Sequence, residues 1–268
     1  MEDHFCRNGT NNDENRPLRS GLYFYNMQVA FLAQQIFTGE ELLKEKAIIV
    51  NNGVIEDIVP KQEVSRNIKL EDLKEHSLFP SFIDSQVYGA GGRLLAVFPD
   101  SLTLKLMHSE FLKDGTVACL PTVATNTIEV FKKCIDAIKL YWSENGEGIL
   151  GIHLEGPWIN QEKRGAHKQE WIHKPAIEEV KDLLNYGKGV IKMITLAPEV
   201  CSTEVIDLIR SHNIIISAGH SNATYQQSLE GFNKGITTVT HLFNAMSPLQ
   251  HRQPGLAGAV LNHHAITA

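Results

Sequence analysis

Short apolar runs alternate with amphipathic segments over most of the chain. Seven apolar runs lie at 78–84, 116–121, 149–156, 190–199, 213–220, 236–241 and 264–268. Between them lie segments with helical periodicity, of which the clearest are 126–144, 174–187, 202–212 and 223–235. An apolar run followed by an amphipathic helix is the pattern of a βα unit, so the chain is predicted to contain a parallel sheet.

The number of runs favours one α/β architecture over another. Open doubly wound sheets usually have five or six strands, whereas seven runs at this spacing predict a (β/α)8 TIM-type barrel. Such a barrel takes about 250 residues, more than the chain offers after Ser77. No eighth run is present. We therefore expect 78–268 to form a barrel that is incomplete at the C-terminus, in a shortened version of a longer enzyme.

The residues before the barrel have a different pattern. Short alternating runs at 21–77 predict part of a small β-sandwich. Within it, apolar residues flank Asn52 and Gly53, which predicts a tight hairpin because both residue types tolerate positive φ. Residues 1–20 are polar and predict a disordered tail, without the apolar segment of a secretory signal.

Composition narrows the class of protein. Hydrophobic residues make up 43% and charged residues 21% of the chain, which is ordinary for a folded globular protein. No apolar run approaches the roughly 18 residues of a membrane span. With 25 basic and 31 acidic residues, the net charge of −6 argues against nucleic acid and anionic membrane as partners. Four cysteines (Cys6, Cys119, Cys134, Cys201) without a CxxC pair predict reduced thiols and a cytoplasmic protein.

Three side chains suited to metal binding follow three different predicted strands. Glu155 ends the third run, His220 ends the fifth and His241 ends the sixth. Active sites of parallel barrels lie at the C-terminal ends of the strands, and two histidines with one glutamate form a catalytic zinc site with an open position. The alternative is that all three only make ordinary hydrogen bonds at the rim. His153 is predicted to pack inside the barrel, one layer deeper.

Two loops on the same face carry further candidates. Asn244 and Arg252 follow His241, and the Arg252 guanidinium suits a phosphate or a carboxylate unless it is only a solvated loop charge. His167 lies in the loop after the third run. The glycines at 89, 91 and 92 do not form GxGxxG, and GxSxG is absent, so neither a dinucleotide site nor a serine nucleophile is predicted.

Five motifs in combination resemble one family. HLEGP (153–157), KRGAH (163–167), TLAPE (195–199), AGHSNATY (218–225) and THLFNAMSPLQHRQPGL (240–256) resemble the N-acetylglucosamine-6-phosphate deacetylases of the amidohydrolase superfamily. The resemblance extends from about Asn51 to the last residue. It implies a barrel with a small β-sandwich built from both chain ends, of which only the N-terminal part is expected here.

The resemblance assigns roles residue by residue. It implies that one divalent ion, with zinc expected, binds Glu155, His220 and His241. The implied substrate-binding residues are Ala166, His167, Asn244, Ala245, Arg252 and Gln86. Many amidohydrolases have His-x-His after strand one for a second metal, and this chain has Gln86-Val87-Tyr88 instead, which implies the single-metal branch. Tyr88 stands where Asn is common, and Ser81 replaces the usual Gly of the preceding motif.

The implied reaction removes the acetyl group of N-acetylglucosamine 6-phosphate, giving glucosamine 6-phosphate and acetate. The resemblance also implies a homodimer in which Arg252 serves the neighbouring subunit. The family's general base is an Asp after strand eight, expected beyond Ala268, and no acidic residue follows Glu230. These residues alone are therefore expected to be weakly active or inactive and poorly stable.

Two other functions remain open. The chain is also compatible with a non-catalytic protein that binds a metal ion and a sugar phosphate. A dihydroorotase-like enzyme fits less well, because those enzymes usually keep His-x-His.

Overall fold

The computed structural model describes residues 28–268, which divide into two compact units between Ser81 and Phe82. The predicted tail at 1–20, Cys6 and the first residues of the predicted β part lie outside the described residues. Each unit is described by itself.

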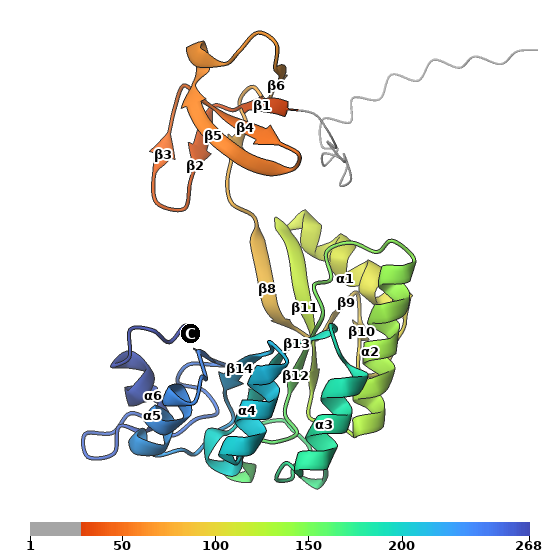
Figure 1. Ribbon diagram of the computed structural model, residues 1–268, viewed down its shortest axis with the longest axis vertical. Coiled ribbons are helices and arrows are strands. Elements are labelled where there is room, and N and C mark those ends of the chain that lie inside the picture. Colours follow the sequence, from red (N-terminus) through yellow and green to blue (C-terminus); the bar gives the residue numbers. More distant parts are fainter. Residues whose placement is uncertain (1–27) are drawn as a thin grey trace, which may run out of the picture. The chain divides into compact units, whose positions relative to one another are not determined.

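The first unit contains two small sheets (Figure 1). The four-stranded sheet has the order β5-β4-β1-β6 and the three-stranded sheet has the order β3-β2-β7. Strand β1 is antiparallel to β4 and parallel to β6. The strands are β1 (Gln28–Leu32), β2 (Gln35–Phe37), β3 (Leu42–Leu43), β4 (Lys46–Asn51), β5 (Val54–Pro60), β6 (Lys69–Asp72) and β7 (Ser77–Leu78).

The predicted hairpin is confirmed. Strands β4 and β5 pair antiparallel on either side of Asn52 and Gly53. Both turn residues have positive φ, 51° and 80°. A two-residue turn with this backbone matches the right-handed twist of the flanking strands.

The second unit is built on a six-stranded sheet in which each paired neighbour is parallel. Its order, β15-β14-β13-β12-β11-β8, is the chain order, so each of these strands lies beside the next along the chain. This arrangement confirms the α/β class and a TIM-type barrel that is incomplete within the described residues. The strands are β8 (Phe82–Val87), β11 (Thr116–Ala124), β12 (Ile152–Glu155), β13 (Ile191–Leu196), β14 (Ile215–Ala218) and β15 (Thr238–Val239).

The last predicted run, at 264–268, forms no strand of its own but begins to pair where a seventh strand belongs. Thr267 makes a parallel bridge with Thr238 of β15. The Val239 N–H donates to the Thr267 carbonyl at 2.9 Å, and the Thr267 N–H donates to the Thr237 carbonyl at 3.1 Å.

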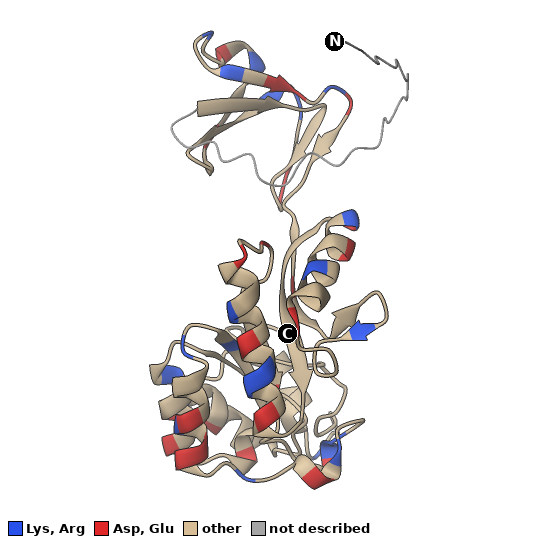
Figure 2. Ribbon diagram, turned by 90° about the vertical axis from the view of Figure 1, so that its right-hand side faces the viewer, with Lys and Arg blue, Asp and Glu red and all other residues tan. Residues whose placement is uncertain are grey.

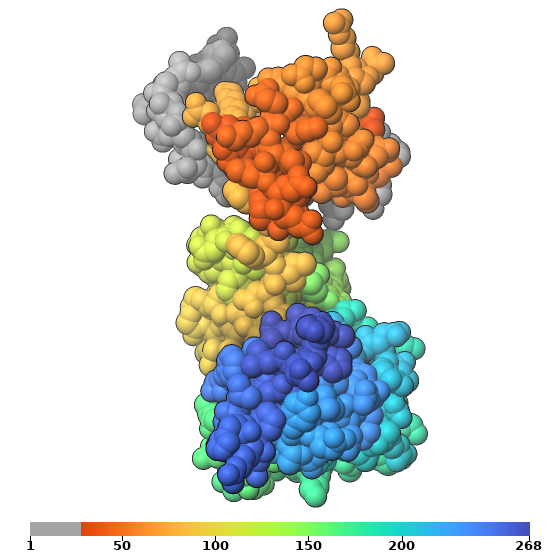
Figure 3. Space-filling model, turned by 90° about the vertical axis from the view of Figure 1, so that its left-hand side faces the viewer, coloured from red at the N-terminus to blue at the C-terminus, as the bar shows by residue number. Residues whose placement is uncertain are grey.

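Helices connect the strands of the second unit. The four predicted segments correspond to α2 to α5, while α1, a short hairpin of β9 (Gly89–Ala90) and β10 (Arg93–Leu94), and α6 lie between or after them. Helix α1 packs on β11, α2 on β12 and α4 on β14. Helices α5 and α6 pack together and form one continuous surface (Figure 3). The helices are α1 (Ser101–Lys113), α2 (Ile128–Ser143), α3 (Ile177–Tyr186), α4 (Thr203–Ser211), α5 (Tyr225–Asn233) and α6 (Gly255–Leu261).

Helix α2 shows how the sequence determines these elements. The Thr127 hydroxyl accepts a hydrogen bond from the Val130 N–H, a cap that stabilises a helix by about 1 kcal/mol. Phe131, Ile135 and Ile138 recur at helical spacing and are fully buried. The outward faces of the helices carry charged residues of both signs (Figure 2). No helix within 28–268 is long and apolar enough to cross a bilayer.

A line of polar side chains crosses the buried interior of the sheet. His153 Nδ1 lies 2.9 Å from the Ser85 carbonyl, which can only accept, so Nδ1 carries a hydrogen. Burial lowers the pKa of His153 to about 4, so the ring is neutral and Nε2 accepts from Thr195, 2.7 Å away. Thr240 then donates to Thr195, and Ser217 donates to Thr240, at 2.8 and 2.7 Å. His153 is thus the packed barrel residue that the sequence predicts.

Three cysteines of the second unit are free and buried. Burial raises the pKa of the Cys119 and Cys134 thiols to about 12 and also raises the pKa of Cys201. Since the thiolate is the reactive form, we expect none of the three to react with Ellman's reagent at pH 8 in the folded protein. All three should react in denaturant. Mass spectrometry of the labelled peptides checks this, and labelling of any of the three before unfolding would contradict it.

Candidate metal centre

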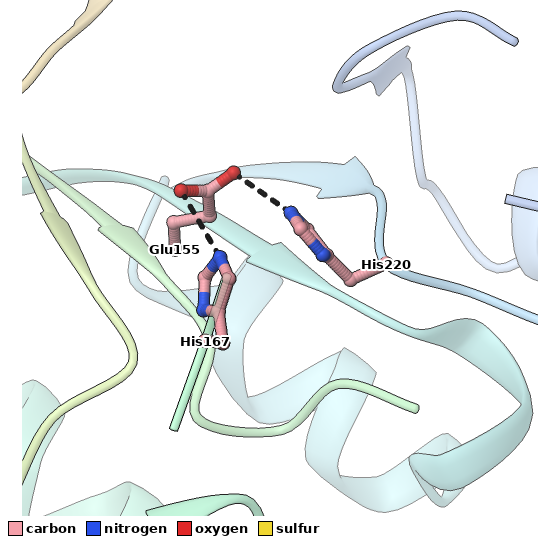
Figure 4. A group of neighbouring side chains, drawn as sticks. All are labelled: Glu155, His167 and His220. Carbon is pink, nitrogen blue, oxygen red and sulfur yellow. Dashed lines mark hydrogen bonds and ion pairs between the residues drawn. The ribbon is translucent and has the colours of Figure 1, made fainter. Parts of the chain in front are cut away.

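The strand ends bring a carboxylate and imidazoles together, as the sequence predicts. Glu155 is the last residue of β12, His220 lies in the turn after β14, and His241 follows β15. His220 Nε2 lies 3.1 Å and His241 Nε2 lies 3.0 Å from the same carboxylate oxygen, Oε1 of Glu155. His167, from the loop after β12, approaches the other oxygen, Oε2, at 3.5 Å. Figure 4 shows how Glu155, His167 and His220 converge.

The backbone turns sharply at two of these residues. His220 has a φ of 48° and His241 a φ of 59°, in the left-handed region that residues other than glycine rarely adopt. Such conformations cost of order 1–3 kcal/mol and persist only where the surrounding structure imposes them. The His220 carbonyl accepts from the Asn160 N–H at 2.8 Å, which ties this turn to the loop after β12. Both imidazoles are therefore aimed by the backbone.

The hydrogen bond made by Nδ1 of His220 determines whether its Nε2 carries a hydrogen or a lone pair. His220 Nδ1 lies 2.9 Å from the Lys163 carbonyl and must donate to it. In the neutral ring, Nε2 then presents its lone pair toward Oε1 of Glu155. Two lone pairs facing each other repel unless a positive charge lies between them. A metal-binding histidine commonly donates its other N–H to a backbone carbonyl in this way, so the donor set fits a divalent ion.

His167 has the opposite tautomer. Its Nδ1 accepts from the Thr125 N–H at 3.2 Å, and a main-chain amide can only donate. The hydrogen of the neutral ring is therefore on Nε2, which faces Oε2 of Glu155. Glu155, His167 and His220 are close enough to hold one ion together. The tautomers nevertheless make His220 the better ligand and His167 a hydrogen-bond donor.

Glu155 is completely buried. Burial by itself would raise its pKa, but the facing imidazoles of His167 and His220 and the hydrogen bond from Tyr88 outweigh burial and hold the pKa far below its usual value. Gln86 Nε2 also donates to Oε1 at 2.8 Å, and the Tyr88 hydroxyl donates to Oε2 at 2.6 Å. The carboxylate is therefore ionised and has partners on both oxygens.

A cavity of about 330 Å³ lies beside the carboxylate. Tyr88 and His167, which both contact Glu155, form part of its wall, together with Ala166, Leu94 and Trp171. Cavities for small ligands typically measure about 300–1,000 Å³ and are mostly apolar with a few polar groups. Ala166 and His167 were both predicted to bind substrate, and the structure places both at this cavity.

The remaining predicted residues lie in the segment between β15 and α6. Asn244 and Ala245 are in the loop after β15, where Ala245 has a φ of 47° and its carbonyl accepts from the Ser221 N–H at 3.1 Å. Asn244 and Arg252 are exposed. Arg252 lines a different cavity of about 490 Å³ at the start of α5, with Thr224 among its neighbours.

Sequence reasoning missed the contact of Tyr88 with Glu155, and it also missed Glu199, which supports the cluster. Glu199 Oε1 accepts from the Asn222 N–H at 2.6 Å and from Asn160 Nδ2 at 2.9 Å, and Oε2 accepts from the Ser221 hydroxyl at 2.7 Å. These bonds hold the turn that carries His220. The signal was present, since Glu199 ends one of the five motifs, but its partners lie in separate loops.

Two family models match the chain. The model described as NagA composite domain matches residues 30–78, and the model described as amidohydrolase family matches residues 77–265. The second match spans more than half of the chain and contains the whole cluster around Glu155. The chain belongs to the amidohydrolase family. Its first unit makes it an amidohydrolase of the NagA type.

The relatives of this amidohydrolase share a substrate class by name. The N-acetylglucosamine-6-phosphate deacetylase of Haemophilus influenzae is 36% identical over 242 residues, covering 90% of this chain and 63% of the relative. The N-acetylgalactosamine-6-phosphate deacetylase of a Shewanella strain is 36% identical over 230 residues, covering 84% and 57%. The crystal structure of N-acetylglucosamine-6-phosphate deacetylase from Pasteurella multocida matches with a TM-score of 0.81 and 36% identity, covering 90% of this chain and 64% of that chain. This amidohydrolase spans less than two thirds of the length of these relatives.

Glu199 gives a test of the supporting bonds. Replacing Glu199 by Ala leaves two donors of the His220 turn and Asn160 Nδ2 without their acceptor, and hydrogen bonds to a charged group contribute about 1.5–3 kcal/mol each. Because Glu199 is partly exposed, we expect Glu199→Ala to lower the free energy of unfolding of the metal-free chain by about 2 kcal/mol. Urea unfolding measures this. Glu170→Ala, at an exposed glutamate, should change it by less than about 0.5 kcal/mol. Equal effects of the two substitutions would contradict the role of Glu199.

Proposed function

We propose that this chain carries the metal and substrate site of a sugar-phosphate deacetylase. The reaction is the metal-dependent hydrolysis of N-acetylglucosamine 6-phosphate to glucosamine 6-phosphate and acetate. The observation that carries the proposal is the pair of imidazole nitrogens, His220 Nε2 and His241 Nε2, aimed at one oxygen of a buried glutamate. The relatives add the substrate class, because those at 36% identity bear deacetylase names.

The proposed ligands of one divalent ion are Glu155, His220 and His241, and the expected ion is zinc. When bound, such an ion polarises an amide carbonyl and lowers the pKa of a bound water toward neutrality. The Nε2 hydrogen of His167 faces Oε2 of Glu155 at the long distance of 3.5 Å, and the residue borders the cavity, so its proposed role is to turn this hydrogen to an oxygen of the bound substrate. Gln86, which donates to Oε1 of Glu155 at 2.8 Å, helps to orient the carboxylate.

The phosphate is assigned to the loop after β15. Asn244 and Ala245 lie in a sharp turn there, and the exposed Arg252 offers a planar pair of N–H donors that suits a phosphate. Since Arg252 lines a different cavity from the one beside Glu155, its proposed role is to serve the site of a second copy in a homodimer.

Hydrolysis needs a further group that this site does not contain. Water attacks the carbonyl carbon, the C–N bond breaks, and a proton must move from the water to the leaving amine. Within the described cluster of Glu155, His167 and His220, the one carboxylate already holds the imidazoles. This favours a second candidate function, in which the chain binds a metal ion and a sugar phosphate without hydrolysis.

Zinc titration of the purified chain tests the metal centre. We expect about one zinc ion per wild-type chain and at least 100-fold weaker binding by Glu155→Ala, because the variant loses the charged ligand that both histidines face. Isothermal titration calorimetry after chelation measures both. Wild-type protein that binds no zinc in a Glu155-dependent manner would contradict the proposed centre.

The zinc-loaded chain is then mixed with N-acetylglucosamine 6-phosphate and, separately, with N-acetylgalactosamine 6-phosphate. Acetate release that disappears in Glu155→Ala supports the deacetylase. Sugar-phosphate binding without acetate supports the second candidate. A preference for the galactosamine substrate would correct the proposed sugar while leaving the reaction class.

A further inference from the structure

The hydroxyl of Tyr88 contacts the carboxylate of Glu155, which lies at the centre of the site. Tyr88 Oη donates to Oε2 of Glu155 at 2.6 Å. The phenol follows β8, whereas Glu155 ends β12, so the bond joins two strand ends that β11 separates in the sheet. Hydrogen bonds to an ionised acceptor at this length are roughly twice as strong as those between neutral groups.

The direction of this bond is fixed by a third residue. Gln86 Nε2 lies 3.0 Å from Tyr88 Oη and 2.8 Å from Oε1 of Glu155, so the amide group donates to both. Because the phenol oxygen accepts from Gln86, its own hydrogen points to Oε2 of Glu155. Gln86, Tyr88 and Glu155 therefore form a closed ring of hydrogen bonds.

The two oxygens of Glu155 consequently have different neighbours. Oε1 faces the Nε2 atoms of His220 and His241, at 3.1 and 3.0 Å. Oε2 faces the Tyr88 hydroxyl at 2.6 Å and His167 Nε2 at 3.5 Å. Oε1 also accepts from Gln86 Nε2 at 2.8 Å and has the lone pair of His220 Nε2 beside it, whereas both of these neighbours of Oε2 are hydrogen donors.

We propose that Tyr88 is a positioning residue that occupies Oε2 of Glu155, so that only the other oxygen, Oε1, binds a single divalent ion. This inference rests on the metal centre proposed above. A carboxylate whose second oxygen is free can turn to bind an ion through both oxygens or hold a second ion. With the Tyr88 hydroxyl in place, either arrangement requires breaking the bond at 2.6 Å.

Tyr88 has a second role that the test must separate from the first. Its ring is part of the wall of the 330 Å³ cavity, with Ala166 and Trp171 nearby in that wall. Tyr88→Phe keeps the ring and the wall and removes only the hydroxyl. A change in metal binding in this variant therefore reports on the hydrogen bond.

The chain offers a matched control. The Tyr186 hydroxyl donates to Oδ2 of Asp136 at 2.5 Å, between α3 and α2, away from the cluster. Tyr186→Phe also removes one phenol hydroxyl that is bonded to a carboxylate. Any general effect of losing such a bond should appear equally in both variants.

The experiment titrates zinc and cobalt(II) into the wild-type chain, Tyr88→Phe and Tyr186→Phe, each shown by circular dichroism to be folded. Loss of a group that orients a metal ligand typically weakens metal binding 10- to 100-fold. We expect a weakening in that range for Tyr88→Phe, together with a changed visible spectrum of the bound cobalt. Tyr186→Phe should bind within twofold of the wild type and show its spectrum.

Stoichiometry gives a measurement that needs no change at Tyr88, with Glu155→Ala as its control. The wild-type chain should bind one cobalt ion in a Glu155-dependent manner even with excess metal, and a second such ion would overturn the proposal. Unchanged affinity and spectrum in Tyr88→Phe would also overturn it, while leaving the metal centre standing. Wild-type protein that binds neither ion would overturn both the metal centre and the role of Tyr88.

Discussion

The buried negative charge of Glu155 constrains how the strands of the second unit are arranged. Removing a carboxylate from water costs several kcal/mol unless hydrogen bonds or opposite charges replace the solvent. Glu155 is completely buried, and its neighbours come from segments that follow β8, β12, β14 and β15. These segments can meet only because the strands are parallel and end at one edge of the sheet. The sheet order and the ionised carboxylate therefore depend on each other.

The sequence predicts the site residues that lie at or directly after the ends of the strands. Glu155, His220 and His241 are found by reading the last residues of apolar runs, because the strand period determines where those side chains lie. The contacts of Tyr88 and Glu199 are not found in this way. They depend on loops and on left-handed backbone at His220 and His241, which periodicity does not encode. The same holds for Arg252, whose cavity is separate from the carboxylate.

His167 and His220 are neighbours, yet each has a different tautomer because each contacts a different main-chain group. A carbonyl, that of Lys163, fixes the hydrogen of His220 on Nδ1, whereas an amide, that of Thr125, fixes the hydrogen of His167 on Nε2. The ring centroids are only 4.2 Å apart. Side-chain identity alone would give both the same role, so the fold distinguishes a lone pair from a donor at the same carboxylate.

The hydrogen bonds in the interior line of hydroxyl groups from Ser217 to His153 all run in one direction. Tolerance to substitution should therefore differ along the line. Every donor in the line points toward the Ser85 carbonyl. Ser217 is the first donor of the line. Loss of its hydroxyl removes the hydrogen bond that Thr240 accepts but leaves no buried hydrogen without an acceptor. Loss of the Thr195 hydroxyl leaves the Thr240 hydrogen without an acceptor and the His153 Nε2 lone pair without a donor. Sequence variation within this layer of the barrel is thus ordered, freest at β14 and most restricted at β13.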